Sequence, residues 1–307
     1  MRAVIAKPGA LRIEDVPAPV PNPMQALVRV QTISLNRGEV RLALSDSPNA
    51  RPGWDFAGVV EQAATSGLGP KVGTRVVGVR PSGAWAERLA VEPDWIAALP
   101  EQVSVAAAST LPVAGLTAYH ALRHGGFLAG RRVLVNGASG GVGHFACQLA
   151  ALSGAEVVAT MRNAKHAQAL EASGAALAAV VTSATEIGHH GPYDLALDSN
   201  SGAWLTAALA SLKPDGLCVV YGITDAPTSS IDVRKFFYTG GGRLYGLAMF
   251  HELRRESASI GLGLLAKLVA QGKLKTHIEL EAPIAEIGEI AHRMLDRTIL
   301  GKAVLRF

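Results

Sequence analysis

Residues 131–153 read RRVLVNGASGGVGHFACQLAALS, and this stretch decides the fold. It opens with the β-branched, apolar run Val133-Leu134-Val135, which is typical of a buried strand in a parallel sheet. A glycine-rich turn follows, and after it comes an apolar stretch with helical spacing. The order of strand, turn and helix predicts the start of an α/β domain.

The glycine-rich turn has the spacing of a dinucleotide-binding fingerprint. It reads Ala138-x-Gly140-x-x-Gly143, with Ala in place of the usual first Gly. Gly140 would let the backbone approach a pyrophosphate on the helix N-terminus, where free N–H groups and the helix dipole favour anions. A turn that only joins a strand to a helix can show the same pattern. The predicted phosphate contacts are Ala138, Ser139, Gly140, Gly141, Val142 and Gly143.

The end of the next predicted strand favours NADP(H) over NAD(H). The ribose-reading residue is expected about 20 residues past the glycine-rich turn. Residues 160–165 read TMRNAK there, with no acid. A carboxylate would hold a ribose 2′-hydroxyl and repel a 2′-phosphate, whereas basic side chains pair with phosphate oxygens. We therefore predict that Arg162, Asn163 and Lys165 bind the cofactor, the alternative being solvated charges on a loop.

The composition is that of a globular protein without a nucleic-acid or membrane partner. Lys and Arg number 29 against 25 Asp and Glu, and the net charge of +4 comes without any basic run. No apolar stretch reaches the ~18 residues needed to span a membrane, and the N-terminus does not resemble a signal peptide. The two cysteines, Cys147 and Cys218, fall in predicted buried elements. Small core thiols favour a reducing compartment, so we expect a cytoplasmic protein.

The length of 307 residues predicts two domains. The first hundred residues contain short strands separated by Gly and Pro, which is typical of a small closed barrel. From residue 131 strands and helices alternate with short connections, which predicts a doubly wound parallel sheet with right-handed crossovers. The last predicted strand returns to the barrel. The predicted division is therefore 1–104 with 251–307 for the barrel domain, and 105–250 for the nucleotide-binding domain.

The predicted elements follow this division. In the barrel domain we predict strands at 2–5, 11–16, 25–33, 53–60, 73–79, 83–91 and 302–307, and a helix at 257–271. An Ala-rich helical stretch at 106–122 is interrupted by Pro112. In the second domain we predict strands at 133–136, 156–160, 177–181, 194–197, 217–221 and 243–247, and helices at 142–153, 164–173 and 203–211.

Several short motifs carry a family resemblance. They are Asn36-x-x-Glu39, GWDFAGVV at 53–60, GAWAE at 83–87, AASTLPVAGLTAY at 107–119, GASGGVG at 137–143 and GKAVL at 301–305. Their order resembles the medium-chain dehydrogenase/reductase superfamily, and within it the zinc-independent quinone oxidoreductase group. The resemblance implies a GroES-like barrel domain, a Rossmann domain and an active-site cleft between them. It also implies hydride transfer from NADPH to a quinone or an activated alkene, and a homodimer. We expect the dimer contact at an edge strand at 240–247, the alternative being an ordinary internal strand.

The resemblance also assigns roles to single residues. Thr117 matches a position near the nicotinamide, Asn36 a polar group over the nicotinamide face, and Lys302 a position that reaches the cofactor phosphates. The alternatives are a helix-capping Thr, a turn Asn and an ordinary Lys at the end of a strand. Residues that follow predicted strands at the carboxyl edge, where ligands bind in open α/β sheets, complete the cofactor set: Asn200, Tyr221 and Gly222.

The proton donor and the acceptor pocket are less defined. Tyr245 and Tyr238 are candidate donors, although water can also protonate a reduced quinone or enone. Arg41 stands where quinone oxidoreductases often carry a Tyr. Arg37 and Arg41 therefore either favour a polar or anionic acceptor or are surface charges on a helix.

No metal is predicted. In the zinc-dependent branch of the superfamily a Cys lies where this chain has Asn36, and Gly-His-Glu lies where this chain has Gly53-Trp54-Asp55. Trp cannot ligate zinc, and two cysteines cannot supply the branch's four-cysteine lobe. The alternative is adventitious binding by pairs of histidines.

We therefore expect an NADPH-dependent quinone or enone reductase that works without zinc, acting on a small molecule as a homodimer. The first alternative is an enoyl-thioester or alkenal reductase of another branch, with the same cofactor. The second alternative is an NADPH-binding redox sensor without turnover.

Overall fold

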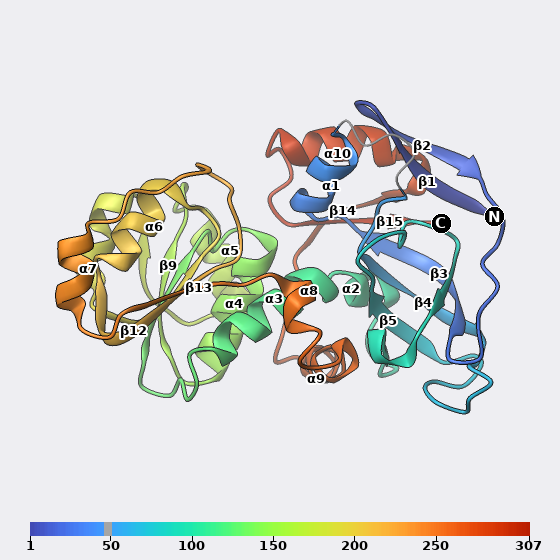
Figure 1. Cartoon of the computed structure of the whole chain (residues 1–307), viewed down its shortest axis with the longest axis horizontal. Helices are drawn as coiled ribbons and strands as arrows, with labels where there is room; N and C mark the ends of the chain where they lie inside the picture. The colour runs from blue at the N-terminus through green and yellow to red at the C-terminus, as the bar shows by residue number, and fades with distance from the viewer. Residues whose placement is uncertain (46–50) are drawn as a thin grey trace. The chain divides into compact units, whose positions relative to one another are not determined.

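The computed structural model describes residues 1–45 and 51–307, and contacts along the chain divide it into two units (Figure 1). Unit 1 comprises Met1–Leu116, Leu253–Gly272 and Thr276–Phe307, and unit 2 comprises Thr117–Glu252 with Lys273–Lys275. The first boundary between the two units lies between Leu116 and Thr117, inside helix α3 (Pro112–Arg123) and after the predicted domain boundary at residue 104. The reason is that helix α2 (Val105–Ser109) packs on strands of unit 1.

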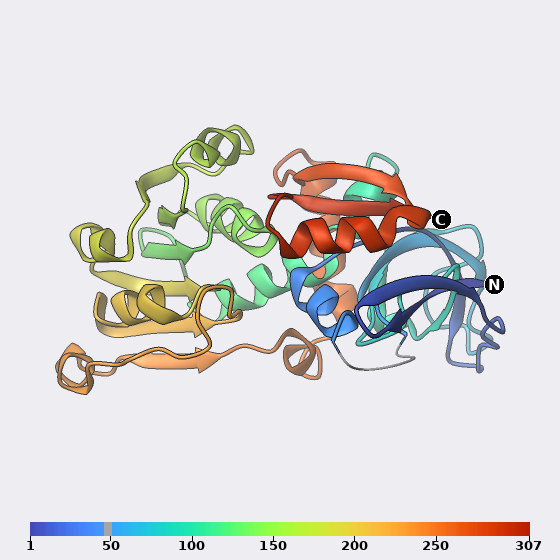
Figure 2. The same cartoon turned by 90° about the horizontal axis from the view of Figure 1, so that it is seen from above.

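Unit 2 contains a six-stranded parallel sheet in the order β10-β9-β8-β11-β12-β13. Figure 2 shows the strands succeeding one another to the orange β13 at one end. The apolar runs of the central strands are buried from both sides, as parallel sheets require. The predicted Rossmann domain is confirmed. The strands are β8 (Arg132–Asn136), β9 (Glu156–Thr160), β10 (Leu177–Val181), β11 (Tyr193–Asp198), β12 (Leu212–Val220) and β13 (Arg243–Gly246).

The strand order of unit 2 reverses at β8, because β9 pairs with one side of β8 and β11 with the other. Ligands of open α/β sheets bind at the carboxyl ends of the strands at such a switch point. The helices of unit 2 are α4 (Gly141–Leu152), α5 (His166–Ala172), η2 (Ala184–His190), α6 (Gly202–Leu209), α7 (Val233–Thr239) and α8 (Met249–Glu252). Helix α7 has only seven residues, none of them buried, so the helical spacing of Val233, Phe236 and Phe237 is too short to be distinctive in the sequence.

Unit 1 contains a seven-stranded sheet in the order β14-β15-β3-β4-β5-β7, with β6 paired to β3. The last strand of the chain, β15 (Lys302–Arg306), pairs antiparallel with β3 (Ala26–Ser34). The remaining strands are β4 (Asp55–Gln62), β5 (Arg75–Val79), β6 (Arg88–Val91), β7 (Ile96–Ala98) and β14 (Ile278–Pro283), with β1 (Arg2–Lys7) and β2 (Ala10–Asp15) forming a separate hairpin.

One predicted strand is shorter than expected. The stretch 83–91 forms a strand only from Arg88 onward, and Ala86 makes an isolated bridge to Ala3. The backbone N–H groups of Ala84 and Trp85 donate to a loop instead of a neighbouring strand. Trp85 N donates to the carbonyl of Pro52 over 3.2 Å, and Ala84 N donates to that of Gly53 over 3.0 Å.

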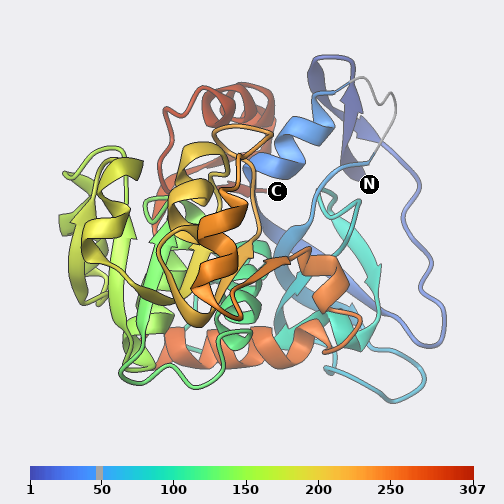
Figure 3. The same cartoon turned by 60° about the vertical axis from the view of Figure 1, so that its left-hand side comes forward.

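The helices of unit 1 lie outside its sheet. Helix α1 (Arg37–Ala43) packs against α10 (Ile287–Leu295), and α9 (Ala258–Ala270) packs on β5 and β7 (Figure 3). Two short 3₁₀ turns, η1 (Pro93–Trp95) and η3 (Ile284–Glu286), complete the unit.

Both cysteines are buried and free, as their predicted positions required. Burial raises the pKa of both thiols, because a thiolate would be desolvated there. Within residues 1–45 and 51–307, no helix combines the length and the hydropathy that crossing a membrane requires.

Candidate functional site

The glycine-rich turn of unit 2 leaves the N-terminus of α4 open. Gly140 is the N-cap residue, no side chain caps the helix, and no acid lies in its first turn. The first N–H groups of a helix have no partner within the helix, so they remain available to an anion. A Cβ atom on Gly140 would meet only the carbonyl oxygen of Gly137, at 3.4 Å. A ligand can therefore approach this backbone closely.

The same turn packs tightly against the start of α4. A Cβ on Gly143 would lie 2.3 Å from the carbonyl oxygen of Gly137 and 2.6 Å from Cα of Ala138. The turn is also fixed to the neighbouring strand, because Gly137 N donates to Thr160 Oγ1 over 3.1 Å and Ala138 N to the Thr160 carbonyl over 2.9 Å. The glycine at 143 thus holds helix and turn together.

The loops after β11 and β12 are tied to each other beside this turn. Thr224 donates from its N–H to the carbonyl of Ser199 over 3.0 Å and from Oγ1 to Asn200 Oδ1 over 3.0 Å. Ser199 Oγ donates to the carbonyl of Asn136 over 3.0 Å. The predicted cofactor residues Asn200 and Gly222 therefore lie at the carboxyl edge of the sheet. The hydroxyl of Tyr221 is buried without a hydrogen-bond partner among the described residues, and burial raises its pKa.

The three predicted residues after β9 lie at the same carboxyl edge. Arg162 is half-exposed, and its Nη2 lies 2.7 Å from Oδ1 of Asp225, which follows β12. Asn163 Oδ1 accepts from the N–H of Lys165 over 3.0 Å, which fixes the turn that leads into α5. The sequence did not predict Asp225 as a site residue. Its position a few residues past a strand at the carboxyl edge was the available signal.

These residues fit a nicotinamide dinucleotide. The uncapped α4 suits the pyrophosphate, the glycines permit close approach, and Arg162 offers a planar fork of donors for a phosphate. The fit rests on the open N-terminus of α4 and on the absence of an acid between residues 160 and 165.

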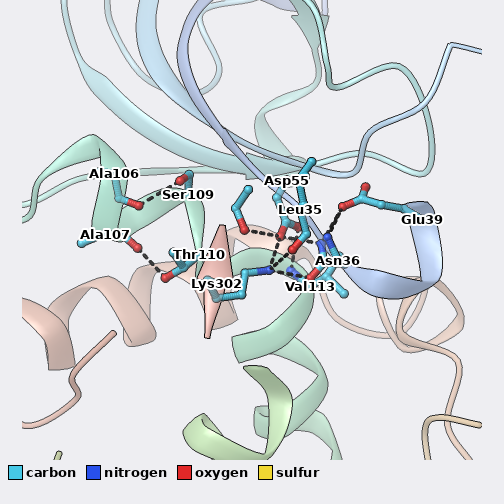
Figure 4. Close-up of polar contacts among 11 residues, drawn as sticks. Leu35, Asn36, Glu39, Asp55, Ala106, Ala107, Ser109, Thr110, Val113 and Lys302 are labelled. Carbon is cyan, nitrogen blue, oxygen red and sulfur yellow. Dashed lines mark hydrogen bonds and ion pairs between the residues drawn. The ribbon is translucent and has the colours of Figure 1, made fainter. Parts of the chain in front are cut away.

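Unit 1 contains a buried polar cluster around Lys302 (Figure 4). Its ammonium donates to Asn36 Oδ1 over 2.6 Å, to the carbonyl of Leu35 over 3.0 Å and to Asp55 Oδ2 over 3.4 Å. Asn36 Nδ2 in turn donates to Asp55 Oδ2 over 2.7 Å and to Glu39 Oε1 over 2.9 Å. Lys302 has three acceptors within unit 1, and both amide hydrogens of Asn36 are directed at carboxylates.

Two carboxyl groups share the single lysine of this cluster. Asp55 and Glu39 are both buried, and Asp55 Oδ1 also accepts from the N–H of Val113 at the start of α3 over 2.9 Å. Burial, more than any other cause, raises the pKa of Glu39 well above its ordinary value, and the charge of Asp55 adds to this. Burial also raises the pKa of Asp55, while Lys302 opposes the change. Glu39 Oε2 has no hydrogen-bond partner among the described residues, which fits a carboxyl that holds a proton.

Comparisons with known proteins agree with both units. The family model described as zinc-binding dehydrogenase matches residues 141–265, and the alcohol dehydrogenase GroES-like domain matches residues 22–101. The chain belongs to the medium-chain dehydrogenase/reductase superfamily. Within the superfamily, it falls in the quinone oxidoreductase group, as the motifs indicated.

Three relatives illustrate this membership. The chloroplast envelope quinone oxidoreductase homolog of Arabidopsis thaliana is 29% identical, over 97% of this chain and 94% of that protein. The quinone oxidoreductase structure from Coxiella burnetii has a TM-score of 0.85 at 26% identity, covering 100% of this chain and 99% of that one. The spectinabilin polyketide synthase system protein NorB of Streptomyces orinoci is 36% identical over 72% of this chain, which spans only 11% of that longer protein.

Thr117, which the resemblance placed near the nicotinamide, is buried in the middle of α3. The alternative that Thr117 caps a helix is wrong, because α3 begins at Pro112.

Tyr245, the predicted catalytic tyrosine, has a carboxylate partner in unit 2. Its hydroxyl donates to Oε1 of the buried Glu252 over 2.5 Å, and His124 Nε2 lies 3.3 Å from Oε2 of the same carboxyl. The rings of His124 and Tyr245 lie with their centroids 4.2 Å apart. The sequence pattern did not single out Glu252. Tyr238, the second candidate donor, is 77% exposed on α7.

The remaining predictions concern the arginines and metal. Arg37 Nη2 donates to the carbonyl of Leu295 on α10 over 3.1 Å, and Arg41 is exposed on α1.

In the part of the chain that the structure describes, no group of three or more His, Cys, Asp or Glu side chains that could hold a metal comes together. In place of the zinc branch's Cys and Gly-His-Glu, this member of the superfamily has Asn36 and Asp55 bound to a lysine ammonium.

The buried cluster predicts a pH-dependent stability that Glu39→Gln removes. A carboxyl whose pKa is raised on folding contributes stability below its ordinary value of 4.5, and this contribution is lost as the pH rises through the raised pKa. We expect the Tm of Glu39→Gln, measured relative to that of the wild type, to be higher at pH 8 than at pH 4.5. Thermal melting at both pH values measures the difference. The exposed Glu289 on α10 provides the control Glu289→Gln, whose difference from the wild type is expected to stay constant. A Glu39→Gln difference that does not change with pH would show that Glu39 is ionised throughout.

Proposed function

We propose that this chain is an NADPH-dependent oxidoreductase that transfers hydride to a quinone or an activated alkene or enone, without zinc. The observation that carries the proposal is the open N-terminus of α4 beside Arg162, with no acid at the end of β9. Membership of the quinone oxidoreductase group supports the reaction class.

The residues proposed for the cofactor divide by the part they bind. Backbone N–H groups at the start of α4 bind the pyrophosphate, and the basic residues after β9 bind the 2′-phosphate. The full proposed set consists of Thr117, Ala138, Ser139, Gly140, Gly141, Val142, Gly143, Arg162, Asn163, Lys165, Asn200, Tyr221 and Gly222. Lys302 and Asn36, which the resemblance placed near the cofactor, are instead proposed as members of the buried cluster of unit 1, because their donors are directed at acceptors there.

The chemistry that NADPH supplies when bound is a hydride at C4 of its nicotinamide. The residues of this chain hold the dinucleotide by its phosphates. The acceptor oxygen gains negative charge when the hydride is added, and it then takes up a proton. Tyr245 is an alternative donor to water, but its proton is directed at the buried Glu252 carboxylate. We therefore propose water as the proton source.

The alternative acceptor is an enoyl thioester or an alkenal. The match to the spectinabilin polyketide synthase system protein NorB is the observation that supports considering it. Following NADPH absorbance with benzoquinone, naphthoquinones, enones, alkenals and enoyl thioesters separates the two. NADPH binding without turnover on the whole panel would instead support a redox sensor.

Arg162→Gln tests the cofactor assignment. Loss of a charge-assisted bond to the 2′-phosphate is expected to weaken NADPH binding by about 10- to 100-fold and to leave NADH binding almost unchanged. Isothermal calorimetry with both cofactors measures this. Arg131→Gln provides a matched control, because Arg131 is an exposed arginine at the amino edge of the same sheet and the variant should bind NADPH like the wild type. Equal losses for NADPH and NADH in Arg162→Gln would remove this residue from its role.

A homodimer through β13 remains part of the proposal. β13 is an edge strand of the unit 2 sheet, and apolar side chains are exposed on it and on the nearby segment that contains α7. These are Ile231, Val233, Phe237, Tyr238 and Leu244. A molar mass in light scattering equal to the 31.9 kDa of one chain would contradict it.

A further inference from the structure

The ion pair between Arg162 and Asp225 crosses the carboxyl edge of the unit 2 sheet. Arg162 follows β9 and Asp225 follows β12, and the strand order places β8 and β11 between them. The glycine-rich turn follows β8. The pair therefore bridges the carboxyl ends of the two strands that form the switch point, where a dinucleotide is expected.

The position of Asp225 is set by its backbone. The N–H of Asp225 donates to the carbonyl of Asn200 over 2.9 Å, and the preceding Thr224 makes two further bonds to the loop after β11. Its neighbour Ala226 lies against Gly202 at the start of α6, where a Cβ on the glycine would come within 3.0 Å. The carboxylate is thus presented to Arg162 by an anchored loop.

The same guanidinium is the proposed ligand of the 2′-phosphate. A carboxylate and a phosphate compete for the same fork of N–H donors, and two anions on one cation repel each other. The side chains of Arg162 and Asp225 are both exposed. Exposed ion pairs are weak, so a phosphate can displace the carboxylate from Arg162. NADH carries a hydroxyl at this position and does not need Arg162.

We propose that Asp225 occupies the 2′-phosphate subsite on Arg162 until NADP(H) displaces it, and so narrows the preference for NADP(H) over NAD(H). This inference rests on the proposed function, because it assumes that Arg162 binds the 2′-phosphate. Asp225 acts here as a specificity-determining residue.

Calorimetric titration of the wild type and Asp225→Asn tests the proposal, with NADPH, NADH and adenosine 2′,5′-bisphosphate as probes. Removing the competing charge is expected to tighten NADPH and bisphosphate binding by about three- to tenfold and to change NADH binding by less than about twofold. The gain should shrink at 0.5 M salt, because exposed charges are then screened. It should also shrink in the Arg162→Gln background, because the cation for which the two anions compete is then missing. Glu171→Gln, which removes an exposed acid from α5 of the same unit, should have no effect.

Unchanged NADPH affinity in Asp225→Asn would overturn the inference while leaving the proposed function intact. Weaker NADH binding with unchanged NADPH binding would also overturn it, since Asp225 would then be a ligand of the ribose hydroxyl. A wild-type chain that binds none of the three probes would refute the proposed function itself.

Discussion

Replacing Lys302 by methionine is expected to lower the free energy of unfolding of unit 1 by about 3–5 kcal/mol. Methionine matches the lysine side chain out to Cε but lacks the ammonium that donates to Asn36 Oδ1 and Asp55 Oδ2. Asp55 would remain buried with no cation to oppose its charge, and a buried charge without a partner is strongly destabilising. Urea denaturation followed by tryptophan fluorescence reports mainly on unit 1, because three of the four tryptophans, Trp54, Trp85 and Trp95, lie in it and Trp204 lies in unit 2.

Two further variants separate this effect from loss of packing. Lys267→Met changes an exposed lysine on α9 of the same unit and should stay within about 0.5 kcal/mol of the wild type. Adding Asp55→Asn to Lys302→Met removes the unpaired charge of Asp55 and should recover part of the loss. If Lys302→Met unfolds with wild-type stability, the ammonium does not stabilise the two carboxyl groups and the account of this cluster fails.

Gly143→Ala is expected to disrupt both the turn and cofactor binding. The new Cβ would meet backbone atoms of Gly137 and Ala138 at 2.3 and 2.6 Å, so the start of α4 must move away from the turn. Overpacking of this kind costs about 1–3 kcal/mol. Losing two charge-assisted bonds from α4 to the pyrophosphate would weaken NADPH binding by on the order of a hundredfold. Thermal melting and calorimetric titration measure the two effects.

Gly263→Ala is the matched control for the glycine substitution. Gly263 lies inside helix α9, and a Cβ there would meet nothing within 4 Å. Alanine favours helix over glycine, so this variant should be at least as stable as the wild type and bind NADPH equally well. A Gly143→Ala variant that behaves like Gly263→Ala would show that the turn can open without loss, which contradicts the proposed phosphate site.

The nucleotide-binding unit could be predicted from sequence because its signals are local. The run of β8, the glycine-rich turn and α4 occupy one continuous stretch, and the ends of the strands place Arg162 and Asn200 at the same edge. Short elements of unit 1 escaped prediction. Helix α1 has seven residues and strand β7 has three, which is too short for apolar periodicity to be distinctive.

The partners of the polar side chains could not be predicted for a different reason. Lys302 reaches Asn36 across 266 positions of the chain, and Arg162 reaches Asp225 across 63. Such pairs depend on how the strands are ordered in each sheet, and residue spacing carries no information on that order. For this reason the sequence did not predict the contact between Lys302 and Asn36, and the resemblance assigned both residues to the cofactor instead.

Calorimetric titration of the wild-type chain with NADPH, and with NADH in parallel, tests the central claim most directly. The account predicts saturable binding of one NADPH per chain, with an affinity at least about tenfold higher than for NADH because of the bond between Arg162 and the 2′-phosphate. Equal affinities for the two cofactors, or no heat from either, would contradict it.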